Sequence, residues 1–244
     1  MFDDISFFML AYGQLKATEK CLESVRKYYK RSKIIVFENY TNILNDICKK
    51  YDAIYIHQPV NYLKQRPELG LNYVCMLDIN DFKLFMNQCE KASSLTNTKW
   101  LLYLEPDCIL RRKIEYFPEK SIGGHLHTFN NFNQDIVQSI NYFRKNNKKN
   151  SYIFSCAGGS ILNRKHLLQV CKANWEKYIE YAIQINKNTN YPCEIRCLDA
   201  ALSYLFYIQE FEAEDWQELT ETQHSNLYRA TTAAIVHDFK YFYE

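Results

Sequence analysis

The chain has 244 residues, of which 47% are hydrophobic, and this length and composition predict one large folded domain. Its formal net charge of +2 argues against a nucleic-acid-binding protein, because contacts to phosphates require concentrated Lys and Arg. The nine cysteines show neither the spacing of a disulfide framework nor that of a zinc site, so we expect free cysteines in a reducing compartment.

The first thirteen residues, MFDDISFFMLAYG, are apolar but too few to span a membrane. Acidic residues occupy the place where a signal peptide carries basic ones. No later apolar run reaches the length of a membrane span. We therefore expect a cytoplasmic protein without a membrane-spanning segment.

The first sixty residues alternate between strand patterns and helical patterns. Apolar residues recur at helical spacing in the segments 15–29 and 41–51. Nearly continuous apolar runs predict three strands, which are Ile5–Gly13, Ser32–Asn39 and Ala53–Gln58. This alternation, with strands that are apolar on both sides, favours a parallel sheet covered by helices on both faces.

A long helix over about 72–94 and a fourth apolar strand, Lys99–Leu104, are expected next. The second half of the chain is less regular. The predicted strands are 122–129, 152–155, 160–163 and a last one that ends at His237, and the predicted helices are 132–145, 164–171, 175–185 and 194–210. Neither an internal repeat nor a Pro-rich linker interrupts the chain, which predicts a single domain over residues 1–244.

Two carboxylates follow directly after the fourth predicted strand, in the segment LLYLEPDCIL. They are Glu105 and Asp107, separated by Pro106. Ligands bind beyond the carboxyl ends of the strands in open parallel sheets, and Mg²⁺ and Mn²⁺ prefer oxygen ligands. The position therefore favours a metal or nucleotide site over the alternative, a strand that simply meets water.

The order of these motifs resembles that of the GT-A fold glycosyltransferases. In that family the first strand ends at a nucleotide-binding loop, here Ala11, Tyr12 and Gly13, and the second ends in an acidic residue, here Glu38 followed by Asn39. A later strand ends in the DxD motif, to which Glu105-Pro106-Asp107 corresponds. The resemblance implies an α/β fold with a mostly parallel central sheet flanked by helices. Residues 1–110 would bind the nucleotide sugar, and 111–244 would bind the acceptor and carry out catalysis.

The resemblance also assigns residues of the second half. The family's small-residue strand near donor and acceptor is similar to the segment 157–160, which contains Gly158 and Gly159. Asp199, at the start of a late helix, corresponds to the catalytic base, and Glu194 is the reserve candidate. The resemblance further implies that His237 binds the metal with Asp107, and that Glu105 contacts the nucleotide. Lys240 would contact phosphate.

These correspondences imply a metal-dependent transferase with a UDP- or GDP-sugar donor and a glycan or protein-linked glycan as acceptor. Mn²⁺ or Mg²⁺ would act as a Lewis acid on the diphosphate leaving group. A carboxylate at the start of a helix favours an inverting reaction, in which it takes the proton of the acceptor hydroxyl. Family members of this compact length include viral ones, in which case the host cytoplasm is the expected location.

Each assigned residue also has a purely structural interpretation. Asp199 could stabilise the start of its helix, and Glu38 could be an ordinary loop acid. Gly158 and Gly159 could serve only a tight turn, and His237 could be an ordinary histidine at a strand end.

The sequence is also compatible with other classes of protein. A metal-dependent hydrolase could use His125 and His127 together with Asp107 and His237. A non-catalytic module that binds nucleotides or carbohydrates is a further alternative. A nucleotidyltransferase and a dinucleotide oxidoreductase are disfavoured, because only Gly13 follows the first strand where these classes need a glycine-rich loop.

Overall fold

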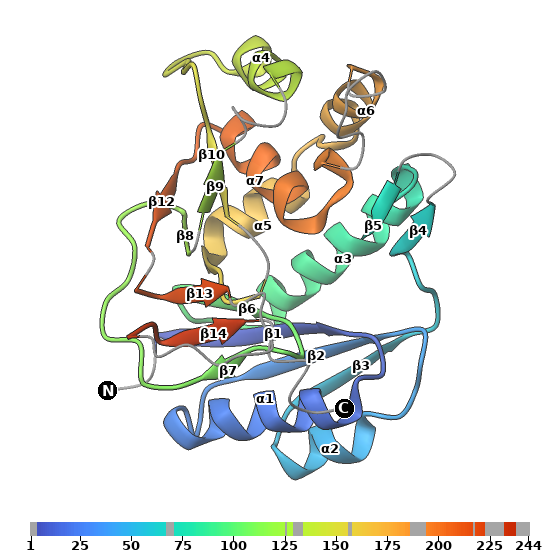
Figure 1. Ribbon diagram of the computed structural model, residues 1–244, viewed down its shortest axis with the longest axis vertical. Coiled ribbons are helices and arrows are strands. Elements are labelled where there is room, and N and C mark those ends of the chain that lie inside the picture. The colour runs from blue at the N-terminus through green and yellow to red at the C-terminus, as the bar shows by residue number, and fades with distance from the viewer. Residues whose placement is uncertain are drawn as a thin grey trace.

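The computed structural model describes residues 4–66, 71–124, 126–128, 134–155, 158–185, 194–216, 218–222 and 232–237. Figure 1 shows an α/β fold around a central seven-stranded sheet with the strand order β12-β8-β11-β6-β1-β2-β3. The strands are β12 (Ala213–Asp215), β8 (Ile122–Gly124), β11 (Ile161–Asn163), β6 (Trp100–Leu104), β1 (Ile5–Ala11), β2 (Ile34–Asn39) and β3 (Ile54–Gln58). The pairs β6-β1, β1-β2 and β2-β3 are parallel, and β11 is antiparallel to both of its neighbours.

Helices cover both faces of this sheet. The helices are α1 (Leu15–Tyr28), α2 (Asn45–Lys50), α3 (Ile79–Leu95), α4 (Gln134–Phe143), α5 (Arg164–Lys172), α6 (Glu176–Ile185) and α7 (Leu198–Ile208). In Figure 1, α1 and α2 lie below the sheet, and α3 and α5 lie above it. The predicted α/β class with a mostly parallel sheet is confirmed.

The side chains of the buried strands point alternately to the two faces of the sheet, and this produces two hydrophobic cores. In β1, Phe7 and Met9 face α1 and α2, whereas Phe8 and Leu10 face α3, α5 and α7. Successive side chains of a strand point to opposite faces, so a strand that is apolar throughout needs a cover on each side.

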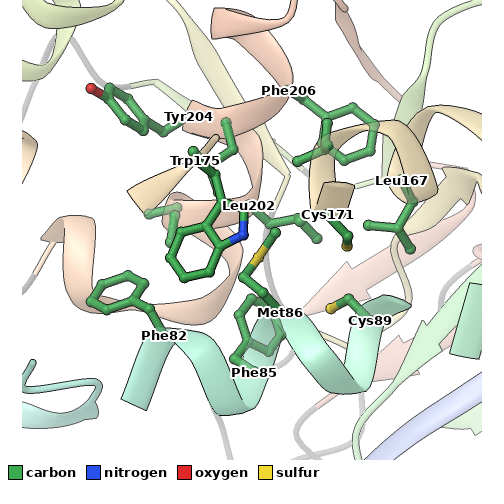
Figure 2. Close-up of a cluster of buried hydrophobic side chains, with 14 of the residues drawn as sticks. Phe82, Phe85, Met86, Cys89, Leu167, Cys171, Trp175, Leu202, Tyr204 and Phe206 are labelled. Atoms are coloured by element: carbon green, nitrogen blue, oxygen red, sulfur yellow. The ribbon is translucent and has the colours of Figure 1, made fainter. Parts of the chain in front are cut away.

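The larger core lies between α3, α5 and α7 (Figure 2). Met86 and Cys89 of α3 point towards Leu167 and Cys171 of α5, and the buried Trp175 fills the space beside them. Each fully buried side chain of this size contributes about 1.5–3 kcal/mol by leaving water. This core fixes α7, and with it the first turn that contains Asp199.

Two helix starts are set by capping side chains. Asp78 accepts hydrogen bonds from the backbone N–H groups of Asn80 and Asp81 at the start of α3. Asn163 accepts equivalent bonds from Lys165 and His166 at the start of α5. Such caps satisfy backbone donors that have no partner inside the helix.

A small second sheet packs beside the carboxyl half of β6. It consists of β13 (Thr220–Thr222), β14 (Ile235–His237) and β7 (Ile109–Leu110), with β14 in the middle. β14 is antiparallel to β7, and β7 starts directly after the turn Glu105–Cys108. The pairing therefore brings the end of the described chain next to the carboxylates after β6.

Three sequence predictions about secondary structure are wrong in part. The helix expected from residue 72 starts only at Ile79, because 71–75 form β5 (Leu71–Cys75), which pairs with β4 (Lys64–Arg66). The single strand expected over 122–129 is divided into β8 and β9 (Leu126–Thr128), and β9 pairs with β10 (Ile153–Ser155) in a separate sheet. The helix expected from 194 begins with a 3₁₀ turn, Glu194–Arg196, before α7.

None of the helices in the described part of the chain is long and apolar enough to cross a membrane. The cysteines that the structure describes are free, and most of them are buried, where cysteine packs as a small hydrophobic residue.

Candidate active site

The carboxyl ends of β1, β2 and β6 meet at one edge of the sheet. Ala11 pairs with Glu38 across β1 and β2, and Met9 pairs with Leu104 across β1 and β6. The residues that follow these three strands therefore emerge side by side. This is the edge at which open parallel sheets bind ligands.

A tight turn places the two carboxylates after β6. The backbone N–H of Cys108 donates to the carbonyl of Glu105 at 3.0 Å, which closes a four-residue turn with Pro106 in its second position. Proline suits this position because its ring presets the backbone angle φ that the turn needs. The turn holds Glu105 and Asp107 close to each other at the strand end.

His237 lies against both carboxylates. Its Nε2 is 2.8 Å from Oε2 of Glu105 and 3.4 Å from Oδ1 of Asp107, although Glu105 precedes it by 132 residues. The imidazole is buried, with 6% of its residue surface exposed. The pairing of β14 with β7 is what delivers His237 to this place. We refer to Glu105, Asp107 and His237 as the acidic cluster.

The charge state of His237 follows from these neighbours. Burial alone would lower the pKa of its imidazole, but the charges and hydrogen bonds of Glu105 and Asp107 raise the pKa well above its ordinary value. Without a metal ion, the proton on His237 therefore balances the two carboxylates. A divalent cation can take the place of that proton, because its ligand is the neutral imidazole.

Cys108 completes the group of atoms that could hold a metal. One ligand atom each from Asp107, Cys108 and His237 lies within 4.8 Å of the others. Burial and the nearby Cys21, Asp107 and Glu105 raise the pKa of the Cys108 thiol well above its usual range. Cysteine binds metals as a thiolate, so the protonated Cys108 is a poorer donor than the carboxylate and the imidazole.

The two glycines before β11 fit tightly against this turn. A Cβ atom on Gly158 would lie 2.4 Å from Sγ of Cys108 and 2.8 Å from the backbone nitrogen of Glu105. Gly159 has φ of +99°, and a Cβ atom there would lie 2.6 Å from the side chain of Thr220. At both positions, neighbouring protein atoms fill the space that a side chain would need. This supports the interpretation that the two glycines serve a tight turn.

Asp199 lies on the α7 side of the same edge. It shares a cavity of about 20 Å³, the size of a single water site, with Tyr103 and Ser160. The Tyr103 hydroxyl donates to Oε1 of Glu105 at 3.0 Å, so Tyr103 links the cavity to the acidic cluster. Asp199 is not the N-cap of α7, which is Cys197, but its Oδ1 accepts from the N–H of Ala200 at 2.9 Å.

Glu38 forms hydrogen bonds with the loop after β2. Its buried carboxylate accepts hydrogen bonds from the Thr41 and Tyr55 hydroxyls, both at 2.6 Å, and from the N–H groups of Ile43 and Leu44. Burial opposes its ionisation, but these donors lower the pKa of Glu38 below its usual value. The carboxylate thus shapes the loop, while contact with a nucleotide stays a prediction.

The loop after β1 packs against the loop after β2. Gly13 has φ of +81°, and a Cβ atom there would lie 2.7 Å from Oγ1 of Thr41. Asn39 is buried and accepts a hydrogen bond from Gln88 at 2.7 Å. Burial raises the pKa of the Tyr12 hydroxyl, which neighbours Tyr62 and Asn39. The predicted nucleotide residues Ala11, Tyr12, Gly13, Glu38 and Asn39 therefore lie together at this edge.

No protein-family model matches the sequence, and a search of curated proteins finds no match. Among solved structures, the galactosyltransferase LgtC in complex with donor and acceptor sugar analogues matches with a TM-score of 0.53 and 12% identity. An active-site mutant of LgtC matches with a TM-score of 0.56 and 14% identity, and each match covers 95% of this chain and 86% of LgtC.

This chain has the GT-A fold of LgtC. A cytidylyltransferase from Leptospira borgpetersenii has a TM-score of 0.43, 11% identity, and coverage of 88% of this chain and 76% of its own, a similarity too weak to establish a common fold. The expected resemblance to GT-A glycosyltransferases is thus confirmed in the fold.

Several predicted residues of this GT-A chain cannot be placed at the site. Lys240, Ala157 and His125 lie outside the described residues, and the structure describes only the backbone of Glu194 and His127. Sequence reasoning missed Tyr103, Cys108 and Thr220 as close neighbours of the site. Cys108 adjoins Asp107 and could have been found by its position, whereas Tyr103 is indistinguishable from other aromatic residues of a buried strand.

Proposed function

We propose that this chain is a metal-dependent glycosyltransferase that moves a sugar from a nucleoside-diphosphate sugar to a hydroxyl of a glycan. The observation that carries the proposal is the convergence of Glu105, Asp107 and His237 at the carboxyl edge of the parallel strands. The GT-A fold shared with LgtC supports it, since LgtC was solved with donor and acceptor sugar analogues.

In this proposal Asp107 and His237 hold the cation. Their carboxylate oxygen and imidazole nitrogen are 3.4 Å apart, and Glu105 is placed to supply a second carboxylate oxygen. A set dominated by carboxylates suits Mn²⁺ or Mg²⁺. When bound, such a cation would neutralise the charge of the departing diphosphate. The loops after β1 and β2 would hold the nucleoside, and Lys240 would face the phosphates.

We assign Asp199 as the general base of an inverting transfer. A base must take the proton of the acceptor hydroxyl on the face of the sugar opposite the leaving group. Asp199 is separated from the acidic cluster by Tyr103, which contacts the cavity on one side and Glu105 on the other. Glu194, at the 3₁₀ turn before α7, is the reserve candidate.

The experiment that tests the proposal measures donor turnover. The protein is incubated with UDP- and GDP-sugars, Mn²⁺ and a mixture of neutral oligosaccharide acceptors, and the released nucleoside diphosphate is quantified. We expect release that requires both the cation and an acceptor, and that stops in Asp107→Asn. Asp46→Asn is the matched control, because the Asp46 side chain is 95% exposed on α2.

Unchanged turnover in Asp107→Asn would contradict the metal assignment. Release that requires the cation but no acceptor would instead favour a metal-dependent hydrolase. Binding of nucleotide with no turnover of any donor would favour the non-catalytic module.

A further inference from the structure

A groove on the small sheet lies apart from the acidic cluster. It encloses about 220 Å³, and its floor is formed by the buried apolar side chains Ile114, Leu219 and Ala234. Pockets for drug-sized ligands enclose about 300–1,000 Å³, so this groove has room for a smaller unit such as one sugar ring. None of the assigned active-site residues lines it.

Two aromatic rings border the groove. Trp216 is partly exposed and Tyr116 is 69% exposed, although large aromatic side chains are normally buried where a core can take them. An aromatic face beside a shallow apolar floor can pack against the C–H groups of a pyranose ring, while its polar edge stays wet. The other two tryptophans, Trp100 and Trp175, are buried at 3% and 7% exposure.

Charged side chains form the rim. Glu115 and Glu218 are exposed there, and Arg112 is held by a hydrogen bond from its Nε to the carbonyl of Thr232 at 3.1 Å. Carboxylates and a guanidinium offer acceptors and donors to sugar hydroxyls. Because the rim carries two carboxylates and one guanidinium, it disfavours a phosphate or a nucleotide and favours a neutral sugar.

The groove and the acidic cluster occupy opposite ends of the small sheet. Ala234 precedes β14 at the groove, and His237 ends β14 at the cluster, about 10 Å further along the strand. On the neighbouring chain segment, Arg112 and Asp107 lie on opposite sides of β7. A glycan of a few sugar residues has the length to reach from one end to the other.

We infer that this groove is a second, non-catalytic carbohydrate site that holds a neutral sugar residue of the acceptor glycan away from the reacting end. The statement that the bound sugar belongs to the acceptor rests on the proposed function. The binding of a neutral sugar in the groove is independent of that function, and it can be measured without donor or cation.

The test is a titration of the metal-free protein with cellobiose, maltose, lactose and chitobiose, followed by tryptophan fluorescence and calorimetry. Trp216 dominates the expected change, because the other tryptophans are buried. We expect at least one disaccharide to give saturable binding. Tyr116→Ala and Glu218→Gln should weaken that binding, the first about tenfold, the equivalent of about 1.4 kcal/mol of lost ring contact.

Two control variants separate this inference from the proposed function. Tyr142→Ala removes an exposed ring on α4, far from the groove in the chain, and should bind the disaccharide normally. Asp107→Asn should also bind it normally, even though it is expected to lose donor turnover. The inference is overturned if no disaccharide binds, or if Tyr116→Ala and Glu218→Gln bind the disaccharide like the unaltered protein.

Discussion

The imidazole of His237 can carry a proton or bind a cation, and its two carboxylate neighbours favour both states. The pKa of His237 is raised in the folded, metal-free protein. The ion pairs of the protonated imidazole therefore make their full contribution to stability below the unfolded-state pKa of about 6.5. This contribution is lost as the pH rises through the folded-state pKa. The proton and the cation compete for the same nitrogen, so cation binding should strengthen with pH.

We therefore predict that Mn²⁺ raises the melting temperature more at about pH 8.5 than at about pH 6. Thermal unfolding with and without Mn²⁺ across this range measures the effect. In His237→Gln, the rise in melting temperature caused by Mn²⁺ should be small and nearly independent of pH. An increment in the unaltered protein that falls with rising pH would contradict the assignment of His237 as a ligand.

Asp199→Asn separates catalysis from helix stabilisation at a single side chain. The amide keeps the size and the acceptor oxygen of the carboxylate, including the bond from Ala200, but cannot act as a base. We predict unchanged nucleotide binding and a loss of transfer of about 10²–10⁴-fold. A variant with normal transfer and a lowered melting temperature would show that Asp199 only supports the start of α7.

At the scale of elements, the contact between the glycine turn before β11 and the turn after β6 shapes the acidic cluster. We predict that Gly158→Ala destabilises the fold by about 1–3 kcal/mol, because the new methyl group would overlap Cys108 and the backbone of Glu105. It should also weaken Mn²⁺ binding, since the Glu105–Cys108 turn must shift. Chemical denaturation and calorimetry measure the two effects.

Gly123→Ala in β8 is the matched control for that substitution. Its new Cβ atom would lie 3.0 Å from Pro118, so the change also crowds the core, but away from the carboxylates. It should lower stability without changing Mn²⁺ affinity. Equal loss of affinity in both variants would mean that the effect comes from general destabilisation.

Elements with one unambiguous pattern could be predicted from the sequence. β1, β2, β3 and β6 are apolar runs separated by helical spacing, and their predicted order gave the edge where Glu105 and Asp107 lie. The hairpin of β4 and β5 could not be predicted, because a short apolar run next to a long helix reads as an extension of that helix.

The assembly of the site was only partly accessible from the sequence. The contact of His237 with Glu105 depends on the pairing of β14 with β7, and short strands carry no signal for the partner or register they adopt. The role of Glu38 in its loop depends on Tyr55 and Thr41, whose hydroxyls look like any others in the sequence.

Across the whole molecule, the fold is retained with little sequence identity. Only 12–14% of residues are identical to LgtC in the two matches, yet the fold is shared over 95% of the chain. Parallel strands deliver their carboxyl ends to one edge whatever side chains fill the core. We propose that this edge binds a nucleoside diphosphate through a cation held by Asp107 and His237.

Calorimetric titration with UDP and GDP, with and without Mn²⁺, measures this cation-dependent binding. We predict that Mn²⁺ strengthens the binding of one of the two nucleotides at least tenfold, equivalent to about 1.4 kcal/mol of coupling. The coupling should vanish in Asp107→Asn and persist in Asp46→Asn. Nucleotide binding that is equally strong with and without Mn²⁺, or coupling that survives in Asp107→Asn, would show that Asp107 does not hold a cation for the nucleotide.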